Sequence, residues 1–481
     1  MRKLALMKLA CIVAVFCVAT VVASSAQTFA TLANFDGSNG DGPYLGALVQ
    51  GTDGNFFGAT QFGGRYNYGE IFAVSPTGTL GRIYSFCADK SACPDGQSPQ
   101  GTPMQAANGN FYGTTSYGGA NNGGTLYAFT PAGTVTTLYS FPNGSTPIAT
   151  LVQGFNGYLY GGDNASGVDV YGTIFAVNPA TGTVTTIYTF CSKPHCVDGT
   201  ASGSLVLAPN GNFYGTTGSG GIHGNGSIFE ITPSGRLTTL YSFNSSTDGQ
   251  DPNSVILATD GNLYGTALYG GLYNGGTVFK VTPTGQFTNL HNFCSQTNCT
   301  DGLAPHAALV QGIDGNLYGT TPLGGTGGTA DCVSRCGTAF QITTSGTLTT
   351  LYNFCSQTNC TDGLAPYYGL VQGTDGNFYG ATIGGGTGSV TAGGVIYRIS
   401  MGLGPFVRAN PGFGAAGHVI SILGNGLTGT TSVSFNGTPA TFTVVSATDI
   451  KATVPAGATT GTIEVTTGSG TLSSNVAFLV Q

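Results

Sequence analysis

Hydrophobic and polar residues of this chain alternate in short runs that recur along most of its length. One phrase, Asp-Gly-Asn-Leu-Tyr-Gly-Thr-Thr at residues 314–321, has variants centred on Gly54, Gly109, Gly157, Gly211, Gly261, Gly315 and Gly376. Successive copies lie 48 to 61 residues apart, and self-similarity at such a period is typical of solenoids and propellers. The apolar residues follow the two-residue period of strands, and no helical periodicity is present.

Each repeat contains four strand-like pieces, which the second copy illustrates. The first two are residues 102–107 and 110–116, joined by Asn-Gly, a pair that accepts positive φ at both central positions of a hairpin turn. The third and fourth are residues 125–130 and 134–141, joined by Pro-Ala-Gly and rich in β-branched and aromatic residues. Four antiparallel strands per repeat are typical of a β-propeller blade.

The ends of the repeat array indicate how it closes. The seventh copy stops after its third piece, residues 395–400, and lacks a fourth. Residues 28–35, Thr-Phe-Ala-Thr-Leu-Ala-Asn-Phe, match the missing piece and precede an Asp-Gly pair as in other copies. We therefore predict an all-β fold, a seven-bladed β-propeller closed by the N-terminal strand, because closure removes exposed sheet edges. An open β-solenoid is the alternative, and it would need capping repeats.

Three segments follow from these patterns. Basic residues, an apolar run at 9–22 and Ala-Ser-Ser-Ala at 23–26 predict a secretory signal peptide over residues 1–26. The propeller is expected over residues 27–402. Short strands with frequent turns then predict a small immunoglobulin-like β-sandwich over residues 403–481. We expect a secreted or cell-surface protein with no membrane span after the signal is removed, since no hydrophobic tail follows.

Cysteine usage agrees with export. Beyond the signal peptide the cysteines form five close pairs, which an exported chain uses as disulfides. The pairs are Cys87/Cys93, Cys191/Cys196, Cys294/Cys299, Cys332/Cys336 and Cys355/Cys360. Zinc is the rival interpretation, but no pair has Cys-x-x-Cys spacing, and only His195 lies inside one. The net charge of −7 and the lack of a Lys/Arg run exclude nucleic acid as a partner.

Both halves resemble known families. Residues 27 to 402 resemble the GloVer tandem repeats of exported bacterial proteins, through the phrase above, Gly-Gly-Thr-Val-Phe-x-Val-Thr-Pro at 275–283 and Thr-Thr-Leu-Tyr-x-Phe at 349–354. The third copy departs most, with Tyr158 and Gly162-Asp163 replacing the usual residues. Gly-Phe-Gly at 412–414 and Val-Ser-Phe-Asn-Gly-Thr-Pro-Ala at 433–440 match the opening and the middle of another family. Through them residues 403–481 resemble an IPT/TIG domain, an immunoglobulin-like module. These resemblances imply export and surface display, and they imply no reaction.

The search for catalytic residues predicts none. His291 replaces the tyrosine of a fourth piece, so we expect a core strand residue. The loop histidines His195, His223 and His306 are the candidate general bases or metal ligands, and the alternative, which we favour, is that they are solvated loop residues. No metal or cofactor is predicted. Aspartates recur before glycine in the long loops, but one per loop falls short of the six to eight oxygens of a calcium site. They are Asp95, Asp198, Asp248, Asp301 and Asp362.

Loops after the second and fourth pieces are long and variable, and they are expected on one face, where binding residues usually reside. Tyrosines there, Tyr368 among them, either stack on sugar rings or cover the blades. The predicted ligand-binding residues are Tyr66, Tyr117, His223, Tyr269, Tyr273, His306 and Tyr367. We expect a non-enzymatic binding, adhesion or surface-display protein whose ligand is a carbohydrate or cell-envelope polymer. The alternatives are an extracellular lyase-like propeller enzyme acting on a polysaccharide or small molecule, and a passive spacer.

Overall fold

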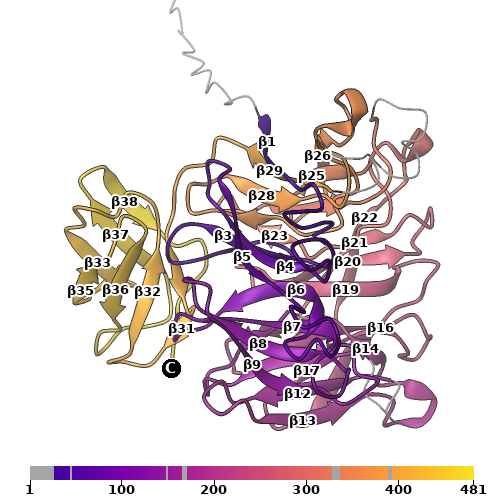
Figure 1. The fold of residues 1–481 in the computed structure, drawn as a ribbon, viewed down its shortest axis with the longest axis horizontal. Coiled ribbons are helices and arrows are strands. Elements are labelled where there is room, and N and C mark those ends of the chain that lie inside the picture. The colour runs from indigo at the N-terminus through magenta and orange to yellow at the C-terminus, as the bar shows by residue number, and fades with distance from the viewer. Residues whose placement is uncertain (1–26, 44–45, 148–149, 165–170, 328–335, 388–392) are drawn as a thin grey trace, which may run out of the picture.

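The computed structural model describes residues 27–481 except 44–45, 148–149, 165–170, 328–335 and 388–392. The predicted signal peptide, residues 1–26, lies outside this part. The described chain is all-β, with three short 3-10 turns, η1 (Pro194–Cys196), η2 (Thr297–Cys299) and η4 (Thr358–Cys360). Figure 1 shows the repeats as one large body and the C-terminal strands as a smaller one beside it.

The described strands up to residue 400 form seven antiparallel sheets, numbered here in chain order. Sheet 1 contains β2 (Val49–Gln50), β3 (Phe56–Thr60), β4 (Glu70–Val74) and β5 (Leu80–Ser85). Sheet 2 contains β6 (Gln97–Gln105), β7 (Phe111–Tyr117), β8 (Thr125–Phe129) and β9 (Val135–Ser140). Sheet 3 contains β10 (Val152–Gln153), β11 (Leu159–Asp163), β12 (Thr173–Val177) and β13 (Val184–Thr189). The third copy is therefore as regular as the others.

Sheets 4 to 7 continue the pattern. Sheet 4 contains β14 (Thr200–Ser202), β15 (Val206–Leu207), β16 (Phe213–Ser219), β17 (Ser227–Ile231) and β18 (Leu237–Ser242). Sheet 5 contains β19 (Gln250–Leu257), β20 (Leu263–Tyr269), β21 (Thr277–Val281) and β22 (Phe287–Asn292). Sheet 6 contains β23 (Val310–Gln311), β24 (Leu317–Thr321), β25 (Thr338–Ile342) and β26 (Leu348–Asn353). Sheet 7 contains β27 (Val371–Gln372), β28 (Phe378–Ala381), β29 (Val395–Ser400) and β1 (Thr28–Asn34).

The N-terminal strand β1 is the outer strand of sheet 7. It runs antiparallel to β29, from Thr28 opposite Ser400 to Asn34 opposite Val395. The register shifts by one residue between Thr31 and Ala33. The same shift occurs between the third and fourth strands of the other six sheets, as at Ile71/Phe72 in sheet 1. A bulge of this kind bends a strand locally, so β1 has the shape of a fourth strand as well as its place.

Apolar clusters join each sheet to the next. Six of them lie between consecutive sheets from sheet 1 to sheet 7. A further cluster contains Phe35 after β1, Tyr379 and Ile396 of sheet 7, and Phe56 and Phe72 of sheet 1. The last sheet therefore packs against the first, with Phe35 fully buried between them.

A glutamine at the end of the first strand links neighbouring sheets by a hydrogen bond. Its Oε1 accepts the backbone N–H just past the corresponding strand of the sheet before it, as from Thr52 to Gln105 at 3.2 Å. The last sheet is linked to the first in the same way, since Thr374 N–H donates to Gln50 Oε1 at 3.0 Å. Gln153, Gln311 and Gln372 make the equivalent bonds. Sheets 4 and 5 have Leu207 and Leu257 at this position.

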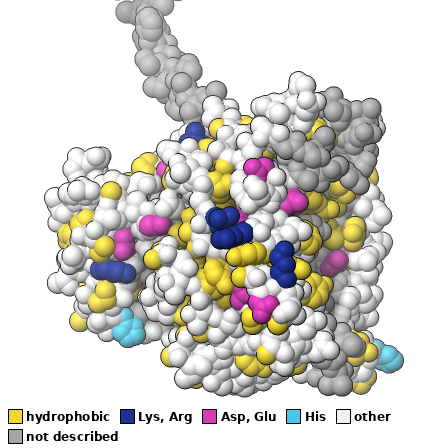
Figure 2. All heavy atoms as spheres, viewed as in Figure 1, with side chains coloured by type: hydrophobic (Ala, Val, Ile, Leu, Met, Phe, Trp, Pro, Cys, Tyr) yellow, Lys and Arg dark blue, Asp and Glu magenta, His cyan; other side chains and the backbone are white. Residues whose placement is uncertain are grey.

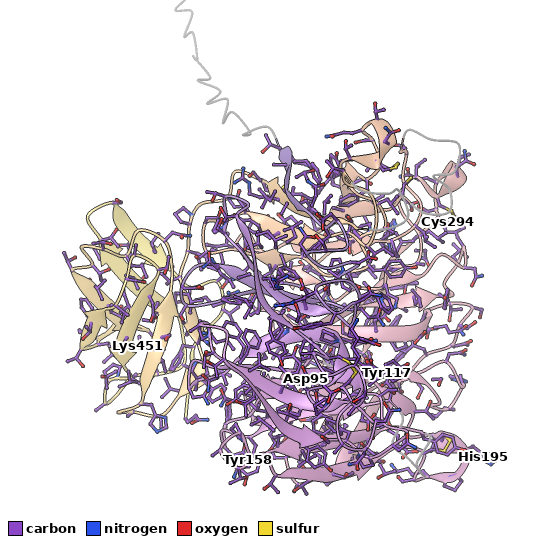
Figure 3. The ribbon with its side chains drawn as sticks, viewed as in Figure 1. Asp95, Tyr117, Tyr158, His195, Cys294 and Lys451 are labelled. Atoms are coloured by element: carbon purple, nitrogen blue, oxygen red, sulfur yellow. A yellow bond between two sulfur atoms is a disulfide. The ribbon has the colours of Figure 1, made fainter. Side chains whose placement is uncertain are left out.

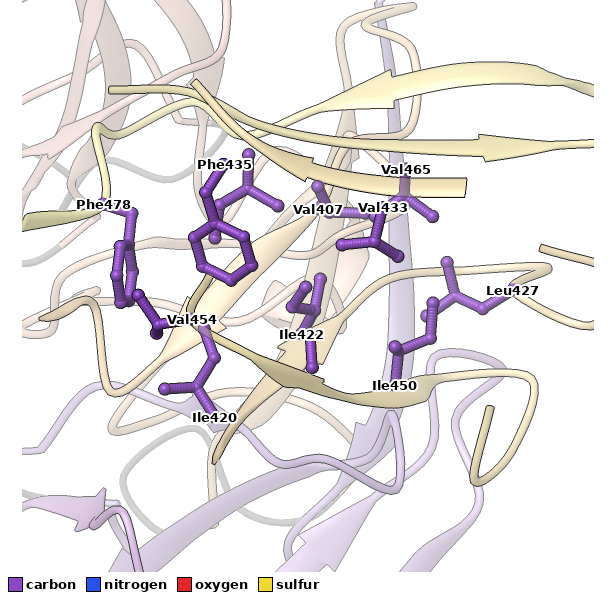
Figure 4. Packing of buried hydrophobic residues seen from close by; sticks show 12 residues of the cluster. Val407, Ile420, Ile422, Leu427, Val433, Phe435, Ile450, Val454, Val465 and Phe478 are labelled. Carbon is purple, nitrogen blue, oxygen red and sulfur yellow. The ribbon is translucent and has the colours of Figure 1, made fainter. Parts of the chain in front are cut away.

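The C-terminal strands form a separate β-sandwich. One sheet has the order β30-β32-β36-β35 and the other β34-β33-β37-β38, with the parallel pair β31 and β39 at one end. The two sheets enclose one apolar core, in which Phe435 meets Phe478 edge to face at 5.0 Å (Figure 4). The strands are β30 (Arg408–Asn410), β31 (Phe413–Gly414), β32 (Val419–Leu423), β33 (Ser432–Phe435), β34 (Thr438–Pro439), β35 (Phe442–Val444), β36 (Asp449–Thr453), β37 (Ile463–Thr467), β38 (Gly470–Ser473) and β39 (Leu479–Val480).

The sandwich packs on the side where each first strand turns into the second, which we call the turn face. Thr448 Oγ1 donates to the carbonyl of Thr52 at 2.9 Å, and Asn425 Nδ2 donates to Thr374 Oγ1 at 3.0 Å. The rings of Phe413 and Phe155 meet at 5.0 Å. The opposite side carries the loops after the second and fourth strands and is called the long-loop face. It is left open by these contacts.

Four of the five predicted disulfides form in the long loops of the described chain. They are Cys87–Cys93, Cys191–Cys196, Cys294–Cys299 and Cys355–Cys360. The fifth predicted pair, Cys332 with Cys336, is not among these four, because Cys332 lies outside the described residues. Cys336 itself is described. It is 3% exposed and packs in one small cluster with Cys355 and Cys360. The bond from Cys336 to Cys332 therefore stays a prediction.

Charged side chains are few and scattered on the face that Figure 2 shows. This agrees with the sequence, in which only 7% of the residues are charged, so no strongly charged surface is available to guide a partner on this face. No helix of the described residues is long and apolar enough to cross a membrane.

Candidate functional site

A cavity of about 510 Å³ lies where the first strands of the sheets converge. Every one of the seven sheets contributes to its lining, through the residues that lead into or form the first strand. One lining residue from each sheet in turn is Ala47, Thr102, Thr150, Ser204, Ser254, Ala307 and Tyr368. Its volume is within the range of small-molecule sites. We call it the central cavity.

The entry to the first strand has the same backbone shape in sheets 2, 5, 6 and 7. A residue with positive φ precedes a proline: Ser98, Asp251, Ala304 and Ala365 have φ between 54° and 57°. A left-handed residue that carries a Cβ costs about 1 kcal/mol or more, and such strain often accompanies a functional site. The residue after the proline differs between sheets and is Gln100, Asn253, His306 or Tyr367. The last three of these line the cavity.

Two ionisable groups of opposite type line the central cavity. Burial raises the pKa of the Asp251 carboxyl and lowers the pKa of the His306 imidazole. Both groups therefore tend toward their neutral forms, because burial disfavours charge. The His306 ring stands edge to face against Tyr367, with 5.4 Å between the ring centroids. The predicted site residues His306 and Tyr367 are thus brought together in one cavity.

Two buried polar atoms of the lining have no hydrogen-bond partner within the described part of the chain. They are Ser254 Oγ and Asn164 Oδ1. Ser254 is 6% exposed. A buried polar atom without a partner costs about 1–3 kcal/mol, and both of these atoms belong to residues that line the cavity.

The other predicted binding residues lie on the tips of the long-loop face. Tyr117 and Tyr269 end the second strands of sheets 2 and 5 and are about half exposed, at 47% and 49%. Tyr66, His223 and Tyr273 occupy one equivalent position in the loops after the second strands of sheets 1, 4 and 5. These five residues do not line the central cavity.

The expectation for Tyr368 needs revision, whereas the exposed position of His195 agrees with a solvated loop histidine. Tyr368, which we expected on the long loops, is 3% exposed and lines the cavity. Its carbonyl accepts a hydrogen bond from Thr320 Oγ1 at 2.8 Å, which fixes the inner strand to the neighbouring sheet. His195 lies in η1 and is exposed at the edge of the large body (Figure 3). Among the described residues, neither His195 nor His223 pairs with an acidic side chain.

The loop aspartates fasten the disulfide loops to the outer strands. Tyr84 donates its hydroxyl to Asp95 Oδ2 at 2.8 Å, and Tyr188 and Tyr352 donate to Asp198 and Asp362 at the same distance. His291 is the expected strand residue in β22, but it is only partly buried. Its Nε2 lies 3.2 Å from Asp301 Oδ2 and so substitutes for the tyrosine hydroxyl. No group of three metal-binding side chains is found among the described residues.

Sequence reasoning missed Asp251, Ser254 and Asn164. A usable signal was the recurring Asp-Gly-x-x-Pro phrase at 248–252, 301–305 and 362–366, whose next residue changes from copy to copy. The long-loop aspartates were recognised, and so were His306 and Tyr367 after their prolines, but the residue before the proline, Asp251, was missed, as was the variation between copies at the position after the proline. That position supplies three of the side chains of the cavity.

The comparisons with known proteins agree with the repeats identified in the sequence. A family model described as the Gloeobacter/Verrucomicrobia repeat matches residues 18–201 and 194–359, more than half of the chain. The chain belongs to this family. An IPT/TIG domain model matches residues 407–480, which comprise almost all of the C-terminal sandwich. Both resemblances inferred from the sequence are confirmed. No curated protein matches the chain.

Solved structures are similar to this repeat protein at low sequence identity. An oligogalacturonate lyase in complex with manganese is 13% identical, with a TM-score of 0.47, covering 78% of this chain and 96% of that one. The extracellular domain of a hybrid two component system from B. thetaiotaomicron is 10% identical, with a TM-score of 0.49, covering 95% and 60%. A fungal alcohol oxidase in complex with copper is 13% identical, with a TM-score of 0.46, covering 94% and 98%. We draw no functional argument from similarity at this level.

Proposed function

We propose that this protein is an exported, non-enzymatic binding protein that holds a carbohydrate unit, free or at the end of a cell-envelope polymer, in the central cavity. The observation that carries the proposal is the lining of one cavity by all seven sheets, with a hydroxyl and an amide oxygen, Ser254 Oγ and Asn164 Oδ1, that have no partner among the described residues. A sugar offers hydroxyls that both donate and accept, and the aromatic ring of Tyr367 offers a face for its apolar side.

The scaffold for this site is a seven-bladed propeller closed by β1. The packing of sheet 7 on sheet 1 through Phe35 supports closure, as does the hydrogen bond from Thr374 to Gln50. Closure explains why the chain places one strand at the opposite end of the array, since a ring has no exposed edge. It also makes the cavity rigid, so that a ligand is bound without ordering the site first.

The disulfides support export of the protein from the cytoplasm. Four close pairs lie in the long loops, and structural disulfides persist in oxidising compartments. The IPT/TIG domain packs on the turn face, so a partner that holds this domain leaves the long-loop face free. Exposed Tyr117 and Tyr269 on that face are then placed to contact the rest of a polymer whose end enters the cavity.

A calorimetric screen tests the proposal. Purified protein is titrated with mono- and disaccharides and with envelope polymer fragments. We expect Tyr367→Ala to weaken the binding of the best ligand about tenfold, because a ring contact of about 1 kcal/mol is lost together with burial. Tyr158→Ala is the control, since Tyr158 is exposed on the turn face. If no sugar or polymer binds, or if both variants behave alike, the proposal is wrong, and the passive spacer is the better account.

A second function is favoured by one observation, the presence of Asp251 and His306 in the same cavity, where burial raises the pKa of the carboxyl and lowers the pKa of the imidazole, so that each group favours its uncharged form. Groups tuned in this way can act as general acid and base. The function would be that of an extracellular enzyme, lyase-like, that acts on a polysaccharide or small molecule. Incubation with polysaccharides, followed by NMR of the products, distinguishes it. An enzyme would release products that the Asp251→Asn variant does not, whereas a binding protein would release none.

A further inference from the structure

Asp251 is the acidic residue of the central cavity, and its carboxylate is left without a donor. Among the described residues, no side chain or backbone group gives it a hydrogen bond, although its own N–H donates to the carbonyl of Asn225 at 3.1 Å. The backbone does not require an acid here. The same left-handed position is Ser98 in sheet 2 and Ala304 in sheet 6. The carboxylate therefore has no structural role that its position in the repeat explains.

Gly218 in sheet 4 leaves room for this carboxylate. A Cβ on Gly218 would lie 2.6 Å from Asp251 Oδ1, closer than atoms can approach. The backbone of Gly218 is not left-handed, so its conformation does not demand glycine. Residues at the corresponding position are Ser116 in sheet 2 and Leu268 in sheet 5. The absence of a side chain at Gly218 thus serves the placement of Asp251.

The remaining groups of the lining favour a donor with positive charge. Asn164 Oδ1 is an acceptor and Ser254 Oγ can act as one, and both lack partners within the described chain. The lining contains no Lys or Arg, and its one basic side chain is His306. Burial lowers the pKa of His306, so none of the described side chains that line the cavity offers Asp251 a full positive charge at neutral pH.

We infer that the ligand is anchored by a primary ammonium group held against the Asp251 carboxylate. An ammonium has three donors and no acceptor, which matches a set of orphaned acceptors better than a hydroxyl does. Hydrogen bonds between opposite charges are about twice as strong as neutral ones. The inference rests on the proposed function, because it concerns the same cavity, and it narrows the ligand to an amine. The amine belongs either to an amino sugar or to an amino acid, two sources with the same chemistry.

Calorimetry at about pH 6.5, where amines are protonated, tests the inference. The probes are glucosamine, N-acetylglucosamine, glucose and alaninamide. We expect glucosamine to bind at least about tenfold more tightly than N-acetylglucosamine and glucose. Asp251→Asn keeps the shape of the side chain, and asparagine tolerates positive φ, so the variant should fold. It should lose the preference for glucosamine and change the affinity for glucose less than about threefold.

Two further variants make the result specific. Asp260→Asn removes one negative charge from a turn on the other face, where sheets 2 and 3 have Asn108 and Asn156, and it should leave all affinities unchanged. Gly218→Ala keeps every charge but displaces the carboxylate, and it should weaken glucosamine binding as Asp251→Asn does. If Asp260→Asn has the same effect as Asp251→Asn, the ammonium is attracted by net charge alone and the inference is overturned.

The outcomes separate this inference from the proposed function. Equal affinity for the three sugars overturns the ammonium anchor and leaves carbohydrate binding intact. Binding of alaninamide but of no sugar supports the anchor and refutes the carbohydrate. Binding of glucosamine but not of alaninamide identifies an amino sugar. If none of the probes binds, both proposals are wrong.

Discussion

The substitution Phe35→Ala tests whether the N-terminal strand closes the ring. Phe35 is fully buried between sheets 7 and 1, and its ring meets Phe72 at 5.2 Å with an angle of 67° between the planes. Phe243 lies at the equivalent position inside the array, is equally buried, and meets Phe279 at 5.1 Å and 64°. A buried Phe→Ala change costs about 3–5 kcal/mol. In a closed ring, both substitutions should therefore lower the free energy of unfolding by similar amounts, within about 1 kcal/mol of each other.

Urea unfolding followed by circular dichroism measures this difference. Because repeat arrays can unfold in parts, hydrogen exchange of the β1 amides should be measured on the same samples. Closure predicts that amides of residues 28–34 exchange as slowly as those of β18, residues 237–242. A cost below about 1 kcal/mol for Phe35→Ala beside a full cost for Phe243→Ala would refute closure, since that small value is typical of a surface change. Fast hydrogen exchange of the β1 amides would also count against closure.

Three further predictions concern single buried contacts. Gln50→Ala removes the acceptor of the buried Thr374 N–H, so urea unfolding should show a loss of about 1–3 kcal/mol; a loss below about 0.5 kcal/mol would contradict it. Tyr397→Phe removes a buried hydroxyl that has no partner in the described structure, so the protein should gain about 1 kcal/mol, and a lower melting temperature would contradict this. Burial alone would raise the pKa of Asp301, but hydrogen bonds from His291 and Ser295 hold it below its usual value. Its stabilising contribution is present above about pH 4 and is lost as the pH falls through the lowered pKa; unfolding of Asp301→Asn should be less sensitive to acid there, and an unchanged pH profile would count against the argument.

Much of the fold could be predicted because each repeat contains residue pairs that are typical of tight turns. Asn-Gly and Asp-Gly pairs mark the hairpins, and the match of residues 28–35 to a fourth piece placed β1 beside β29 from the sequence alone. The start of the first strand was less certain, since β6 begins at Gln97 and not at the predicted residue 102. The cause is the strand entry, where a left-handed residue and a proline resemble a loop in sequence, although Gln97 and Pro99 on either side of Ser98 pair with the second strand.

The central cavity could not be predicted for a related reason. A repeat pattern identifies the residues that recur, and these build the scaffold: the buried phenylalanines, the turn glycines and the linking glutamines. A ligand site at the centre of a ring is made from the same position of each repeat, so any chemical specificity must come from positions at which the copies differ. Asp251 beside Gly218, where other sheets have Ala304 and Leu268 at the corresponding positions, is such a difference on two adjacent sheets. In the sequence, Gly218 and Asp251 are two unrelated departures from the repeat pattern in separate copies. Only the packing of sheet 4 against sheet 5 shows that Gly218 leaves room for Asp251.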